Sequence, residues 1–340
     1  MKGALNRTVV ALLALILAGC ASPPAPTAVA AHRKPSVCLV TSAGPGNEAL
    51  NQSAQDGIAA SHAVSNVIES PVPAVYAANL EQCATARPDL TVALSAGMSA
   101  ATWQVAKHHP SLRFALVDAR LTDDQGRAAD LPNVTDLLFK EQEAGYLVGV
   151  LAGMMETMKV GGAVHNKVGG FGATDAPASQ RYLAGFIAGA RSVDPNVGVK
   201  LDWTTVADQA GCKAIGTAQV HTQVDILFQA AGACGPGYIE AAYDGHAYAI
   251  GSGEDQANLS PAVITSAVKR LDRALQLTIQ RLAAGAFTPG PVYFGLAEDA
   301  TGFAQPSSVV PQSILIQLGR VQADIRAGTV TPPAVLPPGL

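Results

Sequence analysis

A chain of 340 residues, 14% of them charged and 49% hydrophobic, is long enough for two packed domains and too apolar to be disordered over most of its length. The formal net charge is −4, and the lysines and arginines are scattered along the chain. Nucleic acid is therefore not an expected partner.

The amino-terminal residues 1–20 have the organisation of a lipoprotein signal peptide. Lys2 and Arg7 provide a short positive region, and the apolar run 8–18 is too short to span a bilayer. That run ends in Leu-Ala-Gly followed by Cys20, a pattern typical of bacterial lipoproteins, in which the thiol accepts a diacylglyceryl group. We predict lipidation of Cys20 and an extracytoplasmic, membrane-anchored location in the cell envelope. An ordinary secretory peptide with a chance cysteine is the alternative.

Residues 21–35 are rich in proline and small residues, which predicts an extended tether. Beyond it, the remaining cysteines are even in number, as expected of disulfides in an exported chain. Chain order favours the pairs Cys38–Cys83 and Cys212–Cys234, and free buried thiols are the alternative. None of the cysteine spacings resembles a zinc ligand pair, so we expect no metal.

Short β-rich runs then alternate with longer helical patterns. Several of the runs are continuously apolar, which is typical of parallel strands buried on both faces. The predicted strands are 36–41, 90–95, 113–118, 134–139, 168–171, 197–201, 224–229, 248–251 and 292–296.

Three of the intervening helices have readable ends. One covers 143–158, and another opens at Ala176-Pro177. Ser260-Pro261 predicts the start of a third, with serine as the N-cap and proline in the first turn. Its apolar seam would run from Ile264 to Leu282, with Lys269 beside the seam.

Repeated β-then-α units predict two doubly wound parallel sheets, one in each of two lobes. We assign 36–140 and 262–295 to the amino-terminal lobe, 141–261 and 296–330 to the carboxy-terminal lobe, and 331–340 to a loose tail. Between the two sheets lies a cleft at the carboxyl ends of the strands, where open α/β sheets bind ligands.

No nucleophile elbow, phosphate-binding loop or zinc-protease motif occurs, which argues against an enzyme and against a cofactor. Polar side chains instead follow the strands at the cleft edge. Asn47 and Asn51 share one face of a helix start, and Asp118 ends a strand. Each of these residues also has a simpler structural interpretation. Asn47 could be a helix N-cap, Asp118 could cap nearby amides, and Lys269 could be a solvated lysine. The turn around Gly232 follows a strand and precedes a helix, which suits a cleft-lining loop.

The chain resembles the basic membrane protein family, the lipoprotein substrate-binding components of ABC importers of the purine nucleoside receptor type. The resemblance extends from about Lys34 to about Gln305. Its landmarks, in chain order, are Asn51-Gln52-Ser53-Ala54 with Gly57, the segments 114–119 and 139–145, Gly185-Phe186-x-x-Gly189, Ala230-Ala231-Gly232, Ile250-Gly251 with Asp255-Gln256, and 265–272.

The resemblance implies two lobes joined by three crossovers, closing on a nucleoside whose base lies between two aromatic rings. Asn51, Asp118 and Lys269 match family ligand positions, and Asn47 stands where the family has an aspartate. Both rings are missing, because Leu50 and Val206 stand at those positions. Gly253 replaces one acid, so that only Asp255 remains, and Trp203 is a candidate substitute for a ring. Each lost ring removes about 1–3 kcal/mol of base stacking.

We therefore expect a monomeric, lipid-anchored protein that captures a small polar ligand, nucleoside-like by resemblance, and delivers it to ABC permease subunits. A ligand-sensing receptor without uptake, a nucleoside-processing enzyme and an envelope protein with an empty cleft are the alternatives.

Overall fold

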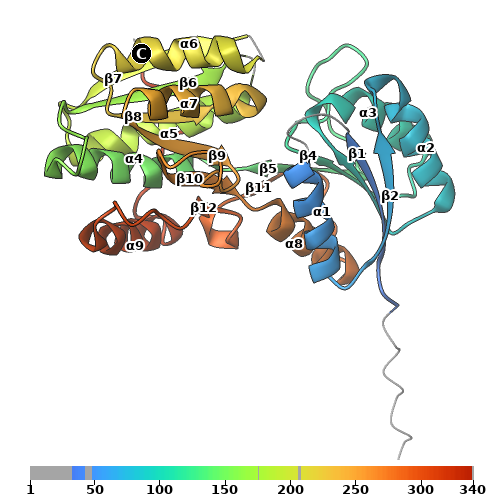
Figure 1. Cartoon of the computed structure of the whole chain (residues 1–340). Coiled ribbons are helices and arrows are strands. Elements are labelled where there is room, and N and C mark those ends of the chain that lie inside the picture. Colours follow the sequence, from blue (N-terminus) through green and yellow to red (C-terminus); the bar gives the residue numbers. More distant parts are fainter. Residues whose placement is uncertain (1–32, 43–47, 175, 206–207, 339–340) are drawn as a thin grey trace, which may run out of the picture. The chain divides into compact units, whose positions relative to one another are not determined.

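The computed structural model describes residues 33–338 except 43–47, 175 and 206–207. Lys34–Leu340 form one compact unit, whose strands make two six-stranded sheets (Figure 1). No helix among the described residues is long and apolar enough to cross a membrane. The expected α/β architecture of two doubly wound lobes is confirmed.

The first sheet is parallel throughout. Alternate residues of its strands enter different cores: Val37 and Leu39 pack on one face, Cys38 and Val40 on the other. Both faces are covered, which explains the continuous apolar runs of the sequence. The strand order is β11 (Gly290–Phe294), β5 (Val134–Phe139), β4 (Phe114–Val117), β3 (Leu90–Leu94), β1 (Ser36–Ser42) and β2 (Val64–Ser70).

The second sheet repeats this plan with one antiparallel edge strand. Ile226 and Phe228 face one core, and Leu227 faces the other. The strand order is β12 (Thr301–Phe303), β10 (Val263–Lys269), β9 (Tyr248–Gly253), β8 (Ile226–Ala230), β6 (Lys167–Ala173) and β7 (Gly198–Thr204).

Helices cover both faces of each sheet (Figure 1). In the first lobe, α1 and α8 share one core and α2 and α3 the other, and in the second lobe α4, α5 and α9 oppose α6 and α7. Their bounds are α1 Glu48–Ala60, α2 Tyr76–Ala86, α3 Ser99–His108, α4 Glu141–Met158, α5 Pro177–Val193, α6 Gln209–Val220, α7 Gly235–Asp244, α8 Leu271–Ala283 and α9 Gln312–Arg326. Short 3₁₀ turns occur at Pro73–Val75, Ala96–Met98, Gly232–Cys234 and Leu296–Glu298.

The chain passes between the sheets three times, after β5, after β10 and after β11. We expected residues 262–295 in the amino-terminal lobe. However, β10 pairs with β9 in the second sheet, so the second crossover follows Lys269. The three crossovers thus leave the ends of β5 and β10 close to the junction between the lobes.

The helix predicted from Ser260-Pro261 was wrong in its first half. Residues Val263–Lys269 form β10, and α8 begins only at Leu271. All side chains from Val263 to Ala267 are buried, and the run is rich in β-branched residues that pack well in a strand. Lys269 therefore lies at the carboxyl end of a strand, not beside a helical seam.

Both cysteine pairs favoured by chain order are joined. Cys38–Cys83 links β1 to α2 in the first lobe, with Cα atoms 5.7 Å apart. Cys212–Cys234 links α6 to the turn before α7 in the second lobe, with Cα atoms 5.9 Å apart. Each disulfide therefore lies within one lobe.

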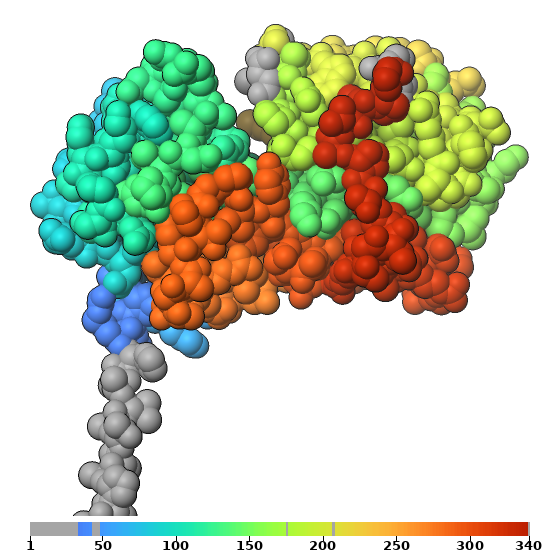
Figure 2. Space-filling model, turned by 180° about the vertical axis from the view of Figure 1, so that it is seen from behind, coloured from blue at the N-terminus to red at the C-terminus, as the bar shows by residue number. Residues whose placement is uncertain are grey.

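We predicted that the segment after α9, residues 331–340, forms a loose tail, and the structure describes it up to residue 338. It runs along the surface of the second lobe (red in Figure 2), where Pro332 is buried and Leu336 packs against the core beneath α4 and α5. Apolar contacts hold this proline-rich segment without regular secondary structure.

Candidate functional site

A cavity of about 610 Å³ opens between the lobes. Ligand pockets for small molecules have about 300–1,000 Å³. Its walls come from α1, β4, β5 and α8 of the first lobe, and from α6, the turn before α7, and the segment after β9 in the second. The carboxyl ends of both sheets therefore face one space. Its lining residues are Ala49, Leu50, Ser53, Val117, Asp118, Phe139, Gln209, Gly232, Ala233, Pro236, Ser252, Gly253, Glu254, Gln256, Leu259, Lys269 and Leu271.

Asp118 and Lys269 meet in this cavity. Lys269 Nζ donates to Asp118 Oδ2 at 2.6 Å. Asp118 follows β4 with a φ of 62°, a left-handed conformation that aspartate adopts more readily than most residues. Its Oδ1 is buried and has no hydrogen-bond partner among the described residues. Asp118 thus pairs with lysine through one oxygen and leaves the other as an acceptor.

Leu50 lines the cavity, and Asn51 is its neighbour on α1. Asn51 Nδ2 donates to the carbonyl of Ser42 at 3.3 Å, and its Oδ1 is a second buried acceptor without a partner among the described residues. Asn51 itself does not line the cavity as described. Asn47 and Val206, both predicted ligand positions, lie outside the described residues, as does Cys20.

In the second lobe, Gly232 lines the cavity with a φ of 62°, and a Cβ at this position would meet nothing within 4 Å. Asp255, the predicted acid, accepts a hydrogen bond from the backbone of Ala257 at 3.0 Å and stabilises a turn. The lining acid is Glu254, which stands one residue earlier. Burial, followed by the neighbouring charge of Asp255, raises the pKa of Glu254.

Glu141 and Arg181 were not singled out from the sequence. Glu141 Oε2 accepts from Arg181 Nε at 2.6 Å, and Glu141 Oε1 lies 3.6 Å from Lys269 Nζ. The segment 139–145 was noted as a family landmark, but nothing in it distinguishes a buried acid from an exposed one. A parallel strand running directly into a helix, with an acid in the first turn, is the signal that could have found Glu141.

Phe139 supplies an aromatic ring that the sequence did not predict for this site. It ends β5, is buried, and lines the cavity, and Lys269 Nζ lies 5.4 Å from its ring centre. Trp203, the suggested substitute for a missing ring, packs against the core of the second lobe and approaches Gly172. The aromatic residue among the described lining residues is therefore at the end of β5.

Burial and the nearby carboxylates act in opposite directions on the pKa values of the two cations of this cluster. Burial alone would lower the pKa of Lys269, but the carboxylates of Asp118 and Glu141 raise it above its ordinary value. Burial likewise opposes the charge of Arg181, and Glu141 outweighs it, so the pKa of Arg181 is raised. Tyr182, fully buried beside them, has a pKa well above its usual range because of burial and then the charge of Glu141. Its phenol is therefore neutral.

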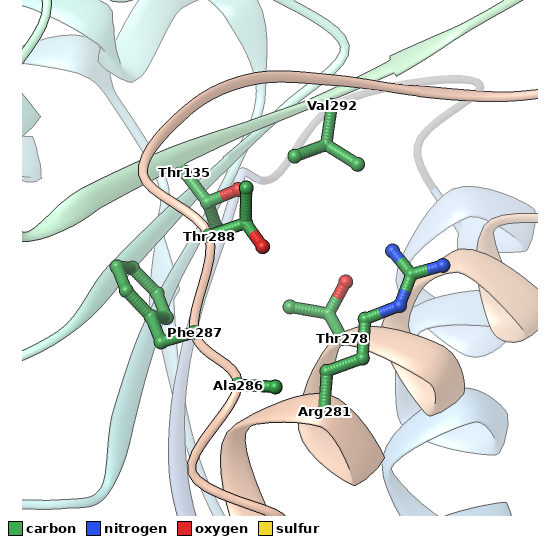
Figure 3. A pocket seen from close by; sticks show the side chains of 7 residues that line it. All are labelled: Thr135, Thr278, Arg281, Ala286, Phe287, Thr288 and Val292. Carbon is green, nitrogen blue, oxygen red and sulfur yellow. The ribbon is translucent and has the colours of Figure 1, made fainter.

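A second cavity lies in the first lobe, between α8 and strands β5 and β11 (Figure 3). Its volume of about 10 Å³ is enough for roughly one water molecule. Of these two cavities, the one between the lobes is therefore the candidate ligand site, because only its volume can hold a small molecule.

Two α/β lobes, three crossovers and a cavity between the carboxyl ends of both sheets define a type I periplasmic-binding-protein fold. Residues 34–331 match the family described as "ABC transporter substrate-binding protein PnrA-like" (Bmp). The chain belongs to this family of substrate-binding proteins, and the resemblance drawn from the sequence is confirmed.

Individual relatives agree with this assignment. The chain is 27% identical over 329 residues to the "CD4+ T-cell-stimulating antigen" of Listeria monocytogenes, covering 88% of each chain. It is 27% identical over 238 residues to the "ABC transporter nucleoside-binding protein BmpA" of Lactococcus lactis, covering 67% of this chain and 64% of the relative. A solute-binding protein of an ABC transporter system from Aeropyrum pernix has the same fold, with a TM-score of 0.70 at 20% identity, covering 88% and 94% of the two chains.

Proposed function

We propose that this protein captures an uncharged, nucleoside-like ligand outside the cytoplasm and delivers it to the permease of an ABC importer. The proposal is based on the cavity of about 610 Å³, which is lined by Asp118, a residue whose Oδ1 is a buried acceptor without a hydrogen-bond partner among the described residues. A buried acceptor without a donor is costly unless a ligand supplies one. Nucleoside hydroxyl and amino groups are such donors, and the Lactococcus relative is named for nucleoside binding.

The cavity walls support a ligand with both a polar and a flat apolar part. Leu50, Phe139 and Leu259 are apolar lining residues, and Asp118 and Lys269 lie among them at the strand ends. Leu50 stands where the family has an aromatic residue, so the base would contact Phe139 and aliphatic side chains. Weaker stacking than in relatives with two rings follows from this change.

Charge favours a neutral ligand. The described lining residues include two acids, Asp118 and Glu254, and one base, Lys269. Their formal net charge is therefore −1. Lys269 is already held by two carboxylates at 2.6 and 3.6 Å. A phosphate group would meet no free cation among the lining residues that the structure describes.

The anchor completes the proposal. Cys20 and its lipoprotein signal support attachment of the mature chain to a membrane in the cell envelope, with residues 21–35 as the tether. Radiolabelled palmitate should enter the protein expressed in a bacterial host, and the Cys20→Ser variant should take up none. Equal labelling of both proteins would contradict lipidation at Cys20.

Native mass spectrometry of the protein as purified tests the ligand directly, because a closed cavity retains a tightly bound molecule. We expect an additional mass that matches a nucleoside. A thermal-shift panel of adenosine, guanosine, inosine, cytidine and uridine on ligand-free protein should then give a rise in Tm for at least one.

If none of the five nucleosides raises the Tm, the nucleoside assignment fails and the cavity takes another class of ligand. Release of free base on prolonged incubation would instead identify an enzyme and contradict transport.

A further inference from the structure

Lys269 is held in place by carboxylates from two separate elements. Its Nζ lies 2.6 Å from Oδ2 of Asp118, which follows the carboxyl end of β4, and 3.6 Å from Oε1 of Glu141, which begins α4. The side chain is only 16% exposed, and Lys269 lines the cavity. An ammonium group on four flexible methylene groups would otherwise sample many positions.

Glu141 is fully buried and does not line the cavity as described. It occupies the first turn of α4, where the helix dipole favours a negative charge. Arg181 of α5 donates to its Oε2 at 2.6 Å and fixes the direction of the carboxylate. The other oxygen, Oε1, has no hydrogen-bond partner among the described residues and is the one near Lys269.

Glycines explain how Arg181 approaches Glu141 so closely. A Cβ on Gly145 would lie 2.2 Å from the carbonyl oxygen of Tyr182, and one on Gly185 would lie 2.1 Å from that of Gln142. Only backbone separates α4 from α5 at these points. The amino-terminal halves of the two helices, which carry Glu141 and Arg181, are thereby brought into contact.

We propose that Glu141 and Arg181 are positioning residues of the ligand site: together they hold Lys269 against Asp118 Oδ2, so that Asp118 Oδ1 keeps no protein partner and can accept a hydrogen bond from a ligand. This inference rests on the proposed function. Neither residue needs to touch the ligand. A buried ion pair contributes little to stability compared with apolar residues of the same volume, so a role in orienting Lys269 is the better account of why these charges are buried here.

The charges facing Lys269 come from every neighbouring element: Asp118 after β4, Glu141 on α4 and Arg181 on α5, with the neutral phenol of Tyr182 beside them. If Glu141 loses its charge, Lys269 keeps one neighbouring carboxylate, that of Asp118, instead of two, and the positive charge of Arg181 remains nearby. The ammonium is then less stable at its present position, and Asp118 alone must hold it.

The test uses Glu141→Gln and the double variant Glu141→Gln/Arg181→Gln, which leaves no unpaired buried arginine and therefore folds if the single variant does not. A matched control is Arg120→Gln. Arg120 Nη1 lies 2.6 Å from the buried Asp136, so this ion pair has the same length as the Arg181–Glu141 pair and a similar exposure. Lys269 does not take part in it. All variants are made in the full-length protein.

Two readouts separate positioning from folding. The first is the pKa of Lys269, measured by NMR of ¹³C-methylated lysines and assigned by the loss of its signal in Lys269→Arg. The second is the affinity for adenosine, guanosine, inosine, cytidine and uridine by calorimetry, with the Tm of every variant recorded.

We expect the Glu141 variants to lower the pKa of Lys269 and to weaken nucleoside binding on the order of tenfold, while Arg120→Gln changes neither. An unchanged Lys269 pKa in both Glu141 variants, or affinity that falls in step with Tm across all variants including the control, overturns the positioning role. If the parent protein binds none of the nucleosides, the proposed ligand class fails, and the Lys269 pKa alone decides whether Glu141 and Arg181 position it.

Discussion

Lys269 Nζ lies 2.6 Å from Asp118 Oδ2 although the two residues are 151 positions apart in the chain. Asp118 leaves a strand of the first sheet, and Lys269 ends a strand of the second. One ion pair therefore joins the carboxyl ends of both sheets at the point where the ligand cavity begins. Asp118 lines that cavity, and its other oxygen, Oδ1, is buried without a hydrogen-bond partner among the described residues.

Asp118→Asn should weaken nucleoside binding by about 10- to 100-fold, because a hydrogen bond to a charged group contributes about 1.5–3 kcal/mol. The substitution keeps the shape of the side chain and removes its charge. Calorimetry with the tightest-binding nucleoside of the panel measures the effect. Asp123→Asn is the control, since Asp123 pairs with Arg127 in an exposed loop. Equal affinities for Asp118→Asn and the parent protein would show that Asp118 is not a ligand contact.

A nucleoside should bind more tightly than its 5′-monophosphate, by about tenfold or more, because the one lining ammonium is already paired and desolvating a phosphate beside two acids is costly. Competition calorimetry with guanosine and guanosine monophosphate compares the two at one pH and salt concentration. Preference for the monophosphate would require a free cation in the cavity that the described residues do not supply.

Gly149→Ala should destabilise the protein by several kcal/mol, on the scale of severe core overpacking. A Cβ there would lie 2.1 Å from the carbonyl oxygen of Phe186, and helix α4 would have to move away from α5. Gly319→Ala on α9 is the matched control: nothing lies within 4 Å of the new Cβ, so the protein should gain up to about 1 kcal/mol from helix propensity. Urea unfolding of both variants measures the contrast, and similar unfolding midpoints would contradict the close helix contact.

Glu156 should make stability depend on pH. Burial, followed by the nearby charge of Asp225, raises its pKa to about 8 in the folded protein. Between its ordinary pKa near 4.5 and about 8, the folded state keeps a proton that the unfolded state has lost, so the contribution of Glu156 to stability falls as pH rises through this window.

Glu156→Gln should therefore match the parent protein near pH 4.5 and exceed its free energy of unfolding at pH 8 by roughly 2–4 kcal/mol. Urea unfolding at both pH values gives the difference. Glu240→Gln, at an exposed acid, should keep the parent's pH dependence. A constant difference between Glu156→Gln and the parent at the two pH values would contradict a shifted Glu156.

Much of the fold follows from the sequence, because strands buried on both faces leave unbroken apolar runs and helices between them leave amphipathic patterns. The edge strand β2 was missed because most of its side chains are exposed and its sequence has no apolar run. Strand β10 was mistaken for a helix because Ile264 and Val268 happen to continue the helical spacing of Leu271 and Leu275 backwards. Spacing alone does not reveal where a strand passes into a helix.

For the site, sequence reasoning found the residues that follow strands. Asp118 and Gly232, which were placed after strands, line the cavity, and so does Lys269, which only the family resemblance assigned to the site. Sequence reasoning named Asp255, whereas the residue that lines the cavity is Glu254, because adjacent acids differ only in which one the local turn engages. It also could not find Glu141 and Arg181, whose contact depends on the approach of two helices. Tertiary packing determines which of the two acids lines the cavity and brings Glu141 to Arg181, and no local sequence pattern records it.

The two disulfides join cysteines that are consecutive in the body of the chain: Cys83 is the next cysteine after Cys38, and Cys234 the next after Cys212. A polypeptide that emerges amino-terminus first therefore presents Cys83 to Cys38 before either later thiol is available. The native bonds can form in the order of synthesis, without a shuffling step. Neither bond crosses from one lobe to the other, so the covalent cross-links impose no limit on opening and closing.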